Sequence, residues 1–234
     1  MKKPQFIDGQ IYHVYNRGVE KRTVFQHDHD YLRFIHDLFE FNDDGPTLNM
    51  AYYFDPKSME VEPPYIEQRH RKPRKLLVEI LAFVLMPNHF HLLLRQKRPD
   101  GVVRFMQKLG TGYTMYFNKK YQRVGGLFQG RYKAILVHEE AHFIYLPFYI
   151  HANPLKLYRG STSIDGMMKF LEKYRWSSFP DYAGKKNFPS VTSRNFLSKV
   201  FGGEEPYRRE VRDLLKHRAE KMEVVRGVAL DSDF

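Results

Sequence analysis

One stretch of the chain limits its fold more than any other: residues 83–94, with the sequence FVLMPNHFHLLL. Both halves of this stretch are apolar and rich in residues that favour strands, and Pro87 and Asn88 between them favour a turn. The pattern predicts two buried strands joined by a tight turn. We therefore expect a sheet with this pair of strands at its centre.

Two histidines, His89 and His91, stand in the second of these strands. Because strand side chains alternate between faces, both imidazoles should point the same way while Phe90 points into the core. Two neutral imidazoles on one face form half of a divalent metal site. The chain has 11 histidines, so such a pair also arises by chance, and spacing alone does not decide between the two interpretations.

The composition points to a polyanionic partner. Lysine and arginine number 38 against 27 aspartates and glutamates, which gives a net charge of +11. Basic side chains mixed with 15% aromatic residues are typical of single-stranded nucleic acid sites, where cations contact phosphates and rings stack on bases. An ordinary basic protein has the same composition, so the inference needs support from motifs.

The lack of cysteine and of long apolar runs excludes several classes of protein. Without cysteine the chain forms no disulfide and no thiolate metal site, and a reducing compartment fits. No apolar run reaches membrane-spanning length, and the first residues, MKKP, lack the apolar segment of a signal peptide. We expect a cytoplasmic protein that does not enter a membrane.

Hydrophobic periodicity predicts the order of strands and helices. Strands are expected at about 11–16, 76–85, 89–96 and 127–137. Helices are expected at about 28–41, 101–120, 139–152, 163–172 and 205–224. Residues 69–75 form a basic run that is either a solvated loop or an arm that contacts phosphates.

A second group of polar residues stands at the end of the helix expected at 139–152. Tyr149 and Asn153 are four residues apart, so they share one helical face. A tyrosine hydroxyl is an oxygen nucleophile, and an asparagine amide offers an oxygen ligand to a hard cation. With the two histidines, these are the groups that phosphodiester cleavage needs. Taken alone, Tyr149 is more simply explained as a packed helical residue.

Several motifs together resemble the REP-associated group of single-tyrosine, HUH-type (IS200-like) transposases. They are, in chain order, YHVYNRG at 12–18, LMPNHFHLL at 85–93, LFQGRYK at 127–133, YIHANP at 149–154 and WSS at 176–178. The resemblance runs from about residue 8 to 182. Its specificity comes from the ordered set of motifs rather than from any single one.

The resemblance implies a role for each matching residue. His89 and His91 would bind Mg²⁺ or Mn²⁺, and Asn153 would complete the metal site. Tyr149 would attack single-stranded DNA beside a hairpin, form a 5′-phosphotyrosine link and free a 3′-OH. The implied enzyme is a transposase that nicks and rejoins single-stranded DNA without a nucleotide cofactor.

The resemblance also implies an α+β fold, a ferredoxin-like sandwich with a central antiparallel sheet and helices on it. The predicted order of strands and helices is compatible with that fold. We expect this domain at 1–182, with an insertion at about 44–75, and a partly helical extension at 183–234. The extension would bind DNA, contact another subunit or cover the active site, and the protein would be a monomer or a homodimer.

Charge and position suggest four side chains for contacts with the DNA backbone: Arg104, Lys108, Arg131 and Lys133. Two alternatives to the transposase remain open. One is a non-catalytic nucleic-acid-binding protein derived from a transposase. The other is a metal-dependent hydrolase in which Tyr149 only orients water.

Overall fold

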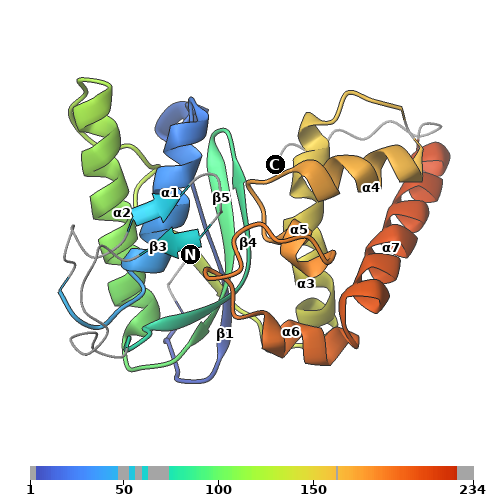
Figure 1. Cartoon of the computed structure of the whole chain (residues 1–234), viewed down its shortest axis with the longest axis horizontal. Helices are drawn as coiled ribbons and strands as arrows, with labels where there is room; N and C mark the ends of the chain where they lie inside the picture. The colour runs from blue at the N-terminus through green and yellow to red at the C-terminus, as the bar shows by residue number, and fades with distance from the viewer. Residues whose placement is uncertain (1–3, 47–52, 56–59, 63–73, 162, 226–234) are drawn as a thin grey trace.

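A four-stranded antiparallel sheet separates two helical layers in the computed structural model of the chain (Figure 1). The structure describes residues 4–46, 53–55, 60–62, 74–161 and 163–225. The sheet has the order β4-β5-β1-β6, formed by β1 (Ile11–Arg17), β4 (Val78–Met86), β5 (His89–Gln96) and β6 (Lys133–Leu136). The predicted strand pair is confirmed, because β4 and β5 pair from Val78 opposite Gln96 to Met86 opposite His89. Its expected position is wrong for β4, which forms one edge of the sheet rather than its centre.

The connections give this sheet a ferredoxin-like topology. Helix α1 (Asp28–Glu40) lies between β1 and β4 in the chain, and α2 (Gly101–Lys120) lies between β5 and β6. The order is therefore strand, helix, two strands, helix and strand, with β1 between β5 and β6 in the sheet. The predicted fold class is confirmed. A separate two-stranded sheet is formed by β2 (Tyr53–Asp55) and β3 (Glu60–Glu62).

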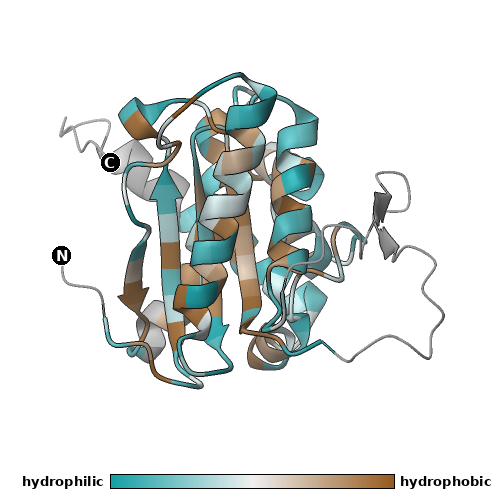
Figure 2. Cartoon of the chain, turned by 90° about the vertical axis from the view of Figure 1, so that its left-hand side faces the viewer, coloured by the Kyte–Doolittle hydropathy of each residue, from teal (hydrophilic) through white to brown (hydrophobic). Residues whose placement is uncertain are grey.

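The two faces of the sheet carry different helices. Helices α1 and α2 cover one face (Figure 1). The other face carries α3 (Glu140–Ala152), the 3₁₀ helix η3 (Asn153–Leu157), α4 (Ile164–Lys173), α5 (Phe179–Tyr182), α6 (Arg194–Phe201) and α7 (Glu204–Val225). Figure 2 shows hydrophilic residues on the outward side of α1 and α2 and hydrophobic residues along much of the strands behind them.

Alternation along the strands supplies a separate core to each face. Phe90 and Leu92 of β5 pack in the first core with residues of α1 and α2. Leu93 of β5 and Val84 of β4 pack in the second core with residues of α3 and α7. Because side chains alternate with a period of two, the strand that sends Phe90 to the first face sends His91 to the second.

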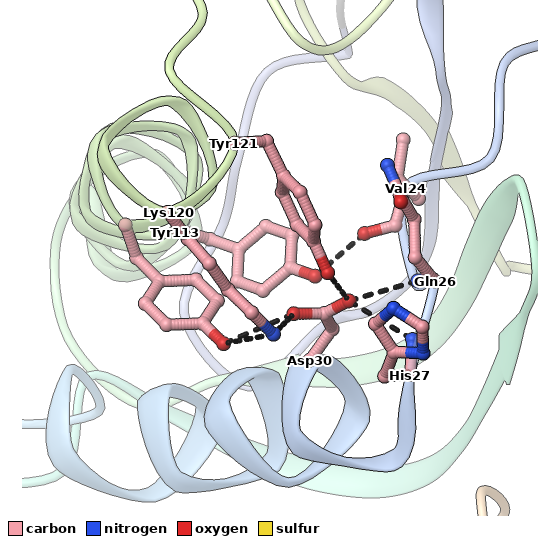
Figure 3. A network of polar contacts seen from close by, with 8 residues as sticks. Val24, Gln26, His27, Asp30, Tyr113, Lys120 and Tyr121 are labelled. Carbon is pink, nitrogen blue, oxygen red and sulfur yellow. Dashed lines mark hydrogen bonds and ion pairs between the residues drawn. The ribbon is translucent and has the colours of Figure 1, made fainter.

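A buried carboxylate joins α1 to the end of α2 (Figure 3). Asp30 is fully buried and accepts hydrogen bonds from the hydroxyls of Tyr116 (3.0 Å) and Tyr121 (2.7 Å) and from Nζ of Lys120 (2.6 Å). Two backbone N–H groups just before α1 also donate to it. Burial opposes ionisation, but the bonds from Lys120 and Tyr121 hold the pKa of Asp30 below its usual value. This network fixes the helical layer behind the sheet.

Several elements differ from their prediction. The strand expected at 127–137 is confined to Lys133–Leu136, because Gly130 has a φ of +68° and its N–H bonds back to Phe128 O in a tight turn. Helices α5 and α6 were not predicted. The helix expected at 205–224 is confirmed as α7, and its Tyr207 and Leu215 lie in the second core with Val84.

The division into domains stays a prediction. Most of the expected insertion at 44–75 lies outside the described residues, and so do residues 69–73 of the basic run. Within the described residues, the segment after 183 contributes side chains to the core beneath the sheet.

Candidate metal and nucleophile site

The paired histidines lie at the start of β5, on the face that carries α3. Their ring centroids are 5.2 Å apart and their planes nearly perpendicular. His91 is 7% exposed, and its ring lies 5.6 Å from the ring of Tyr149 on α3. The two imidazoles thus lie on the same face of β5, as the alternation of strand side chains predicted.

His89 is held in one tautomer by the turn that precedes it. Its Nδ1 lies 2.7 Å from Oδ1 of Asn88. The amide of Asn88 is oriented by its own Nδ2, which donates to the carbonyl oxygen of Lys21 at 3.1 Å. Nδ1 of His89 therefore carries the proton and donates to an oxygen, which leaves the Nε2 lone pair for a metal ion.

Asn153 faces that lone pair from the end of α3. Its side chain is 3% exposed, and its Oδ1 lies 3.4 Å from Nε2 of His89. In the part of the chain that the structure describes, its buried Nδ2 has no hydrogen-bond partner. Two acceptors that face each other suit a cation between them, since adjacent ligands of an octahedral ion lie about 3 Å apart. Imidazole nitrogens with an amide oxygen fit a divalent metal ion.

Burial keeps the imidazoles neutral. It lowers the pKa of His89 to about 4 and, with the neighbouring His13 and His89, that of His91 to about 2. The charges of Lys156 and Arg17 act on His89 in the same direction. At neutral pH both rings therefore have a lone pair available for a metal.

Tyr149 completes the set that the sequence predicted. Its ring meets that of His91 edge-on, at an interplanar angle of 86°. One helical turn separates it from Asn153, so α3 and its end present both to the histidines. The structure brings together the two imidazoles, the amide and the phenol from β5 and α3.

Two other tyrosines, Tyr113 and Tyr116 of α2, are the next candidates for a nucleophile, and both lie elsewhere. Tyr113 is fully buried in the first core and its hydroxyl donates to the carbonyl oxygen of Val24 at 2.6 Å. Burial raises its pKa well above the usual value. Tyr116 donates to Asp30. Both hydroxyls are thus engaged away from the paired histidines.

A third histidine was missed by the sequence analysis. His13 of β1 is 8% exposed, and its Nε2 lies 2.9 Å from Nδ1 of His91. Tyr15, two residues further along β1, stacks on His91 with ring centroids 5.5 Å apart. Both belong to the motif at 12–18, but their place depends on the register between β1 and β5, which no local pattern gives.

The side chains predicted to contact DNA fall into two groups. Lys133 and Arg131 are exposed, and Nζ of Lys133 lies 5.9 Å from the ring centroid of Tyr15, beside the paired histidines. Arg131 lines a cavity of about 650 Å³ that borders α2. Arg104 pairs with the carboxylate of Asp44, and Lys108 donates to the backbone carbonyls of residues 43 and 45. The structure thus brings Lys133 to the site, whereas Arg104 and Lys108 hold a loop.

A different cluster meets the spacing of a metal site. Among the described residues, the one group of three His, Cys, Asp or Glu side chains with ligand atoms within 4.8 Å of one another is His36, Asp37 and Glu40 of α1. Nε of Arg33 lies 3.0 Å from Oδ1 of Asp37. A guanidinium therefore already supplies a cation to these acids.

The motifs of the paired histidines and the tyrosine fall in a segment with known relatives. The family described as "Transposase IS200 like" matches residues 58–153, which include His89, His91, Tyr149 and Asn153. The predicted resemblance to IS200-like transposases is confirmed. The IS200-like segment ends at Asn153, so α4 to α7 lie outside it.

Comparison with solved structures gives a more distant likeness. A REP-associated tyrosine transposase bound to a REP hairpin is 15% identical, with a TM-score of 0.49, and the match covers 83% of this chain and 92% of that one. No curated protein matches the chain. Among the described helices, none has the length and apolar character needed to cross a membrane.

Proposed function

We propose that this protein nicks and rejoins single-stranded DNA next to a hairpin, in a metal-dependent reaction that passes through a 5′-phosphotyrosine on Tyr149. The observation that carries the proposal is the convergence of His89, His91, Asn153 and Tyr149 on one face of the sheet. The confirmed resemblance to IS200-like transposases supports this class of DNA chemistry.

Tyr149 is the nucleophile in this proposal. Its hydroxyl oxygen forms a bond to the scissile phosphorus while the bond from phosphorus to the 3′-oxygen breaks. The phenol loses one proton and the 3′-oxygen gains one, so the step is balanced without an added reactant. The phosphodiester is kept as a phosphotyrosine, and attack by another 3′-OH reverses the step and joins a new strand.

His89, His91 and Asn153 would hold Mg²⁺ or Mn²⁺. When bound, such an ion stabilises the negative charge that develops on the phosphate. The role of the protein is to fix the ligands: Asn88 holds the tautomer of His89, and the end of α3 carries Asn153 on the same rigid element as Tyr149.

Positive charge surrounds these groups. Lys156 and Arg17 lie close enough to His89 to lower its pKa, and Lys133 lies beside Tyr15. We propose that these cations and Arg131 contact DNA phosphates and that Tyr15 offers a ring on which a base stacks. Arg104 and Lys108 of α2 also remain proposed contacts, although both donate hydrogen bonds to the backbone of residues 43–45.

Denaturing gel electrophoresis tests the proposal. The protein is incubated with 3′-end-labelled hairpin DNA from the flanks of its own gene, with Mg²⁺ or Mn²⁺, and we expect a labelled protein–DNA adduct, because the phosphotyrosine keeps the strand on the 3′ side of the nick. Tyr149→Phe should bind the hairpin as the parent does and form no adduct. A hydrolase would give free 5′-phosphate ends without an adduct, and a non-catalytic binding protein would give neither. Either of these outcomes in the parent protein contradicts the proposal.

A further inference from the structure

The third histidine, His13, makes its closest polar contact with one of the proposed metal ligands. The 2.9 Å between Nε2 of His13 and Nδ1 of His91 is a hydrogen-bond distance, and both rings are almost fully buried. The rings are stacked, with centroids 5.1 Å apart and planes 18° apart. His13 thus restricts His91 in two ways, by the stacking of the two rings and by the contact with Nδ1 of His91.

We propose that His13 is a positioning residue that fixes the tautomer and orientation of His91, so that Nε2 of His91 is presented as the ligand atom. The inference rests on the proposed function. His13 would then act on His91 as Asn88 acts on His89. In each case an acceptor at hydrogen-bond distance from Nδ1 of the ligand histidine fixes its tautomer.

The placement of one proton carries the argument. Since Nδ1 of His91 faces His13, only Nε2 of His91 remains as a ligand, and a ligand nitrogen must be without a proton. The neutral ring then carries its proton on Nδ1 and donates it to Nε2 of His13. For Nε2 of His13 to accept, His13 must carry its own proton on Nδ1. The opposite direction of donation would put the proton of His91 on Nε2 and block the metal.

The sheet makes this contact rigid. His13 pairs with Leu93 in the register of β1 and β5, so it lies diagonally next to His91 on the same face. Tyr149 meets both rings edge-on, with ring centroids 6.2 Å from His13 and 5.6 Å from His91. A rotation of His91 would therefore disturb the nucleophile as well as the ligand.

A role for His13 as a ligand is the competing explanation. Among the described residues, His13, His89 and His91 do not form a group whose ligand nitrogens all lie within 4.8 Å of one another. His13 contacts Nδ1 of His91, whereas the proposed ligand atom of His91 is Nε2. The geometry therefore favours an orienting bond over a third imidazole ligand.

The first test reads the tautomer in the metal-free protein. Nitrogen NMR of ¹⁵N-histidine-labelled protein, assigned with single-histidine variants, should show the proton of His91 on Nδ1. In His13→Phe, which keeps a flat ring but offers no acceptor, His91 should become a mixture of tautomers. A parent protein with the proton of His91 on Nε2 would overturn the proposal.

The second test measures Mn²⁺ binding by calorimetry or electron paramagnetic resonance. His13→Phe should bind Mn²⁺ about 10- to 100-fold more weakly than the parent, as for other residues that orient metal ligands. His13→Gln restores an acceptor and should recover most of the affinity. His91→Ala should abolish binding, and His29→Ala, at an exposed position on α1, should leave it unchanged.

The outcomes separate this inference from the proposed function. Parent-like affinity in His13→Phe, or a loss as complete as that of His91→Ala with no rescue by glutamine, would refute the positioning role. A parent protein that binds no Mn²⁺ would remove the proposed function instead, and the tautomer of His91 would still decide the role of His13.

Discussion

Nδ1 of His151 and the hydroxyl of Tyr207 lie 2.6 Å apart in the core between α3 and α7. The imidazole is fully buried, and its Nε2 lies 2.7 Å from Oγ of Ser178. His151 stands midway between Tyr149 and Asn153 in the chain. Helix α7 thus packs against α3, the helix that carries the proposed nucleophile, and supports it through this bond. The sequence did not predict this role for the segment after residue 183.

We expect Tyr207→Phe to lower the free energy of unfolding by about 1–3 kcal/mol. The change leaves a buried imidazole nitrogen without its partner while the stacking on Phe148 remains. Urea denaturation followed by circular dichroism measures the loss. Tyr145→Phe is the control, because Tyr145 is 54% exposed on α3, the helix that carries His151, and it should change stability little. Equal effects of the two changes would show that the buried bond contributes nothing.

Metal binding should stabilise the folded chain through His89. A ligand at 100 times its Kd adds about 2.7 kcal/mol to the free energy of unfolding, which raises Tm measurably. We expect Mn²⁺ to raise the Tm of the parent and of His29→Ala, and to leave that of His89→Ala unchanged. The reason is that His89 offers its Nε2 lone pair towards Asn153. A metal-induced shift in His89→Ala as large as in the parent would place the ion elsewhere, with His36, Asp37 and Glu40 as the next site to test.

A buried acid should make stability depend on pH. Burial raises the pKa of Asp37 from about 3.8 to about 7, although Arg33 opposes the shift. Between these values the folded chain binds more protons than the unfolded chain, so this contribution to the free energy of unfolding falls as pH rises, by up to about 1.4 kcal/mol per pH unit. We expect the stability of Asp37→Asn relative to the parent to increase from pH 5 to pH 8.

Denaturation at pH 5, 6.5 and 8 measures this difference. Asp28→Asn, at an exposed position of the same helix, is the control, and its stability relative to the parent should vary much less with pH. A constant difference for Asp37→Asn would mean that Asp37 is ionised throughout, held by Arg33.

Local patterns predicted the parts of the site that a single element builds. The strand pair and the common direction of His89 and His91 follow from alternation, and Tyr149 and Asn153 share a face because they are one helical turn apart. His13 was missed because its contact depends on how β1 and β5 are aligned. Asn88 was taken only as a turn residue, since its bond to Lys21 joins segments far apart in the chain.

The same reason explains the differences in the fold. The strand predicted at 127–137 has suitable residues, but Gly130 turns the backbone and interrupts the pairing, which continues beyond the turn only as an isolated bridge between Gly18 and Phe128. Charge and position suggested DNA contacts by Arg104 and Lys108, which stay a prediction, and the folded chain brings the acidic turn at 43–44 against both side chains. Charge in a sequence shows which side chains are basic, and the fold decides which of them stay available.

DNA affinity should therefore respond differently to lysines that are equal in charge. Lys133 is exposed beside the proposed site, whereas Lys108 donates to two backbone carbonyls at 2.6 and 2.7 Å. For about six to ten phosphate contacts, affinity for DNA falls roughly 10³- to 10⁵-fold between 50 and 200 mM salt. We expect Lys133→Ala to weaken hairpin binding and to reduce the slope of log K against log salt by about one. Lys108→Ala should change the slope less, because Lys108 already donates to two backbone carbonyls. Fluorescence anisotropy over a salt series measures both variants.

Two outcomes would contradict this prediction. A salt response that is flat in the parent would remove the electrostatic basis of binding, and a larger change for Lys108→Ala than for Lys133→Ala would place the DNA along α2.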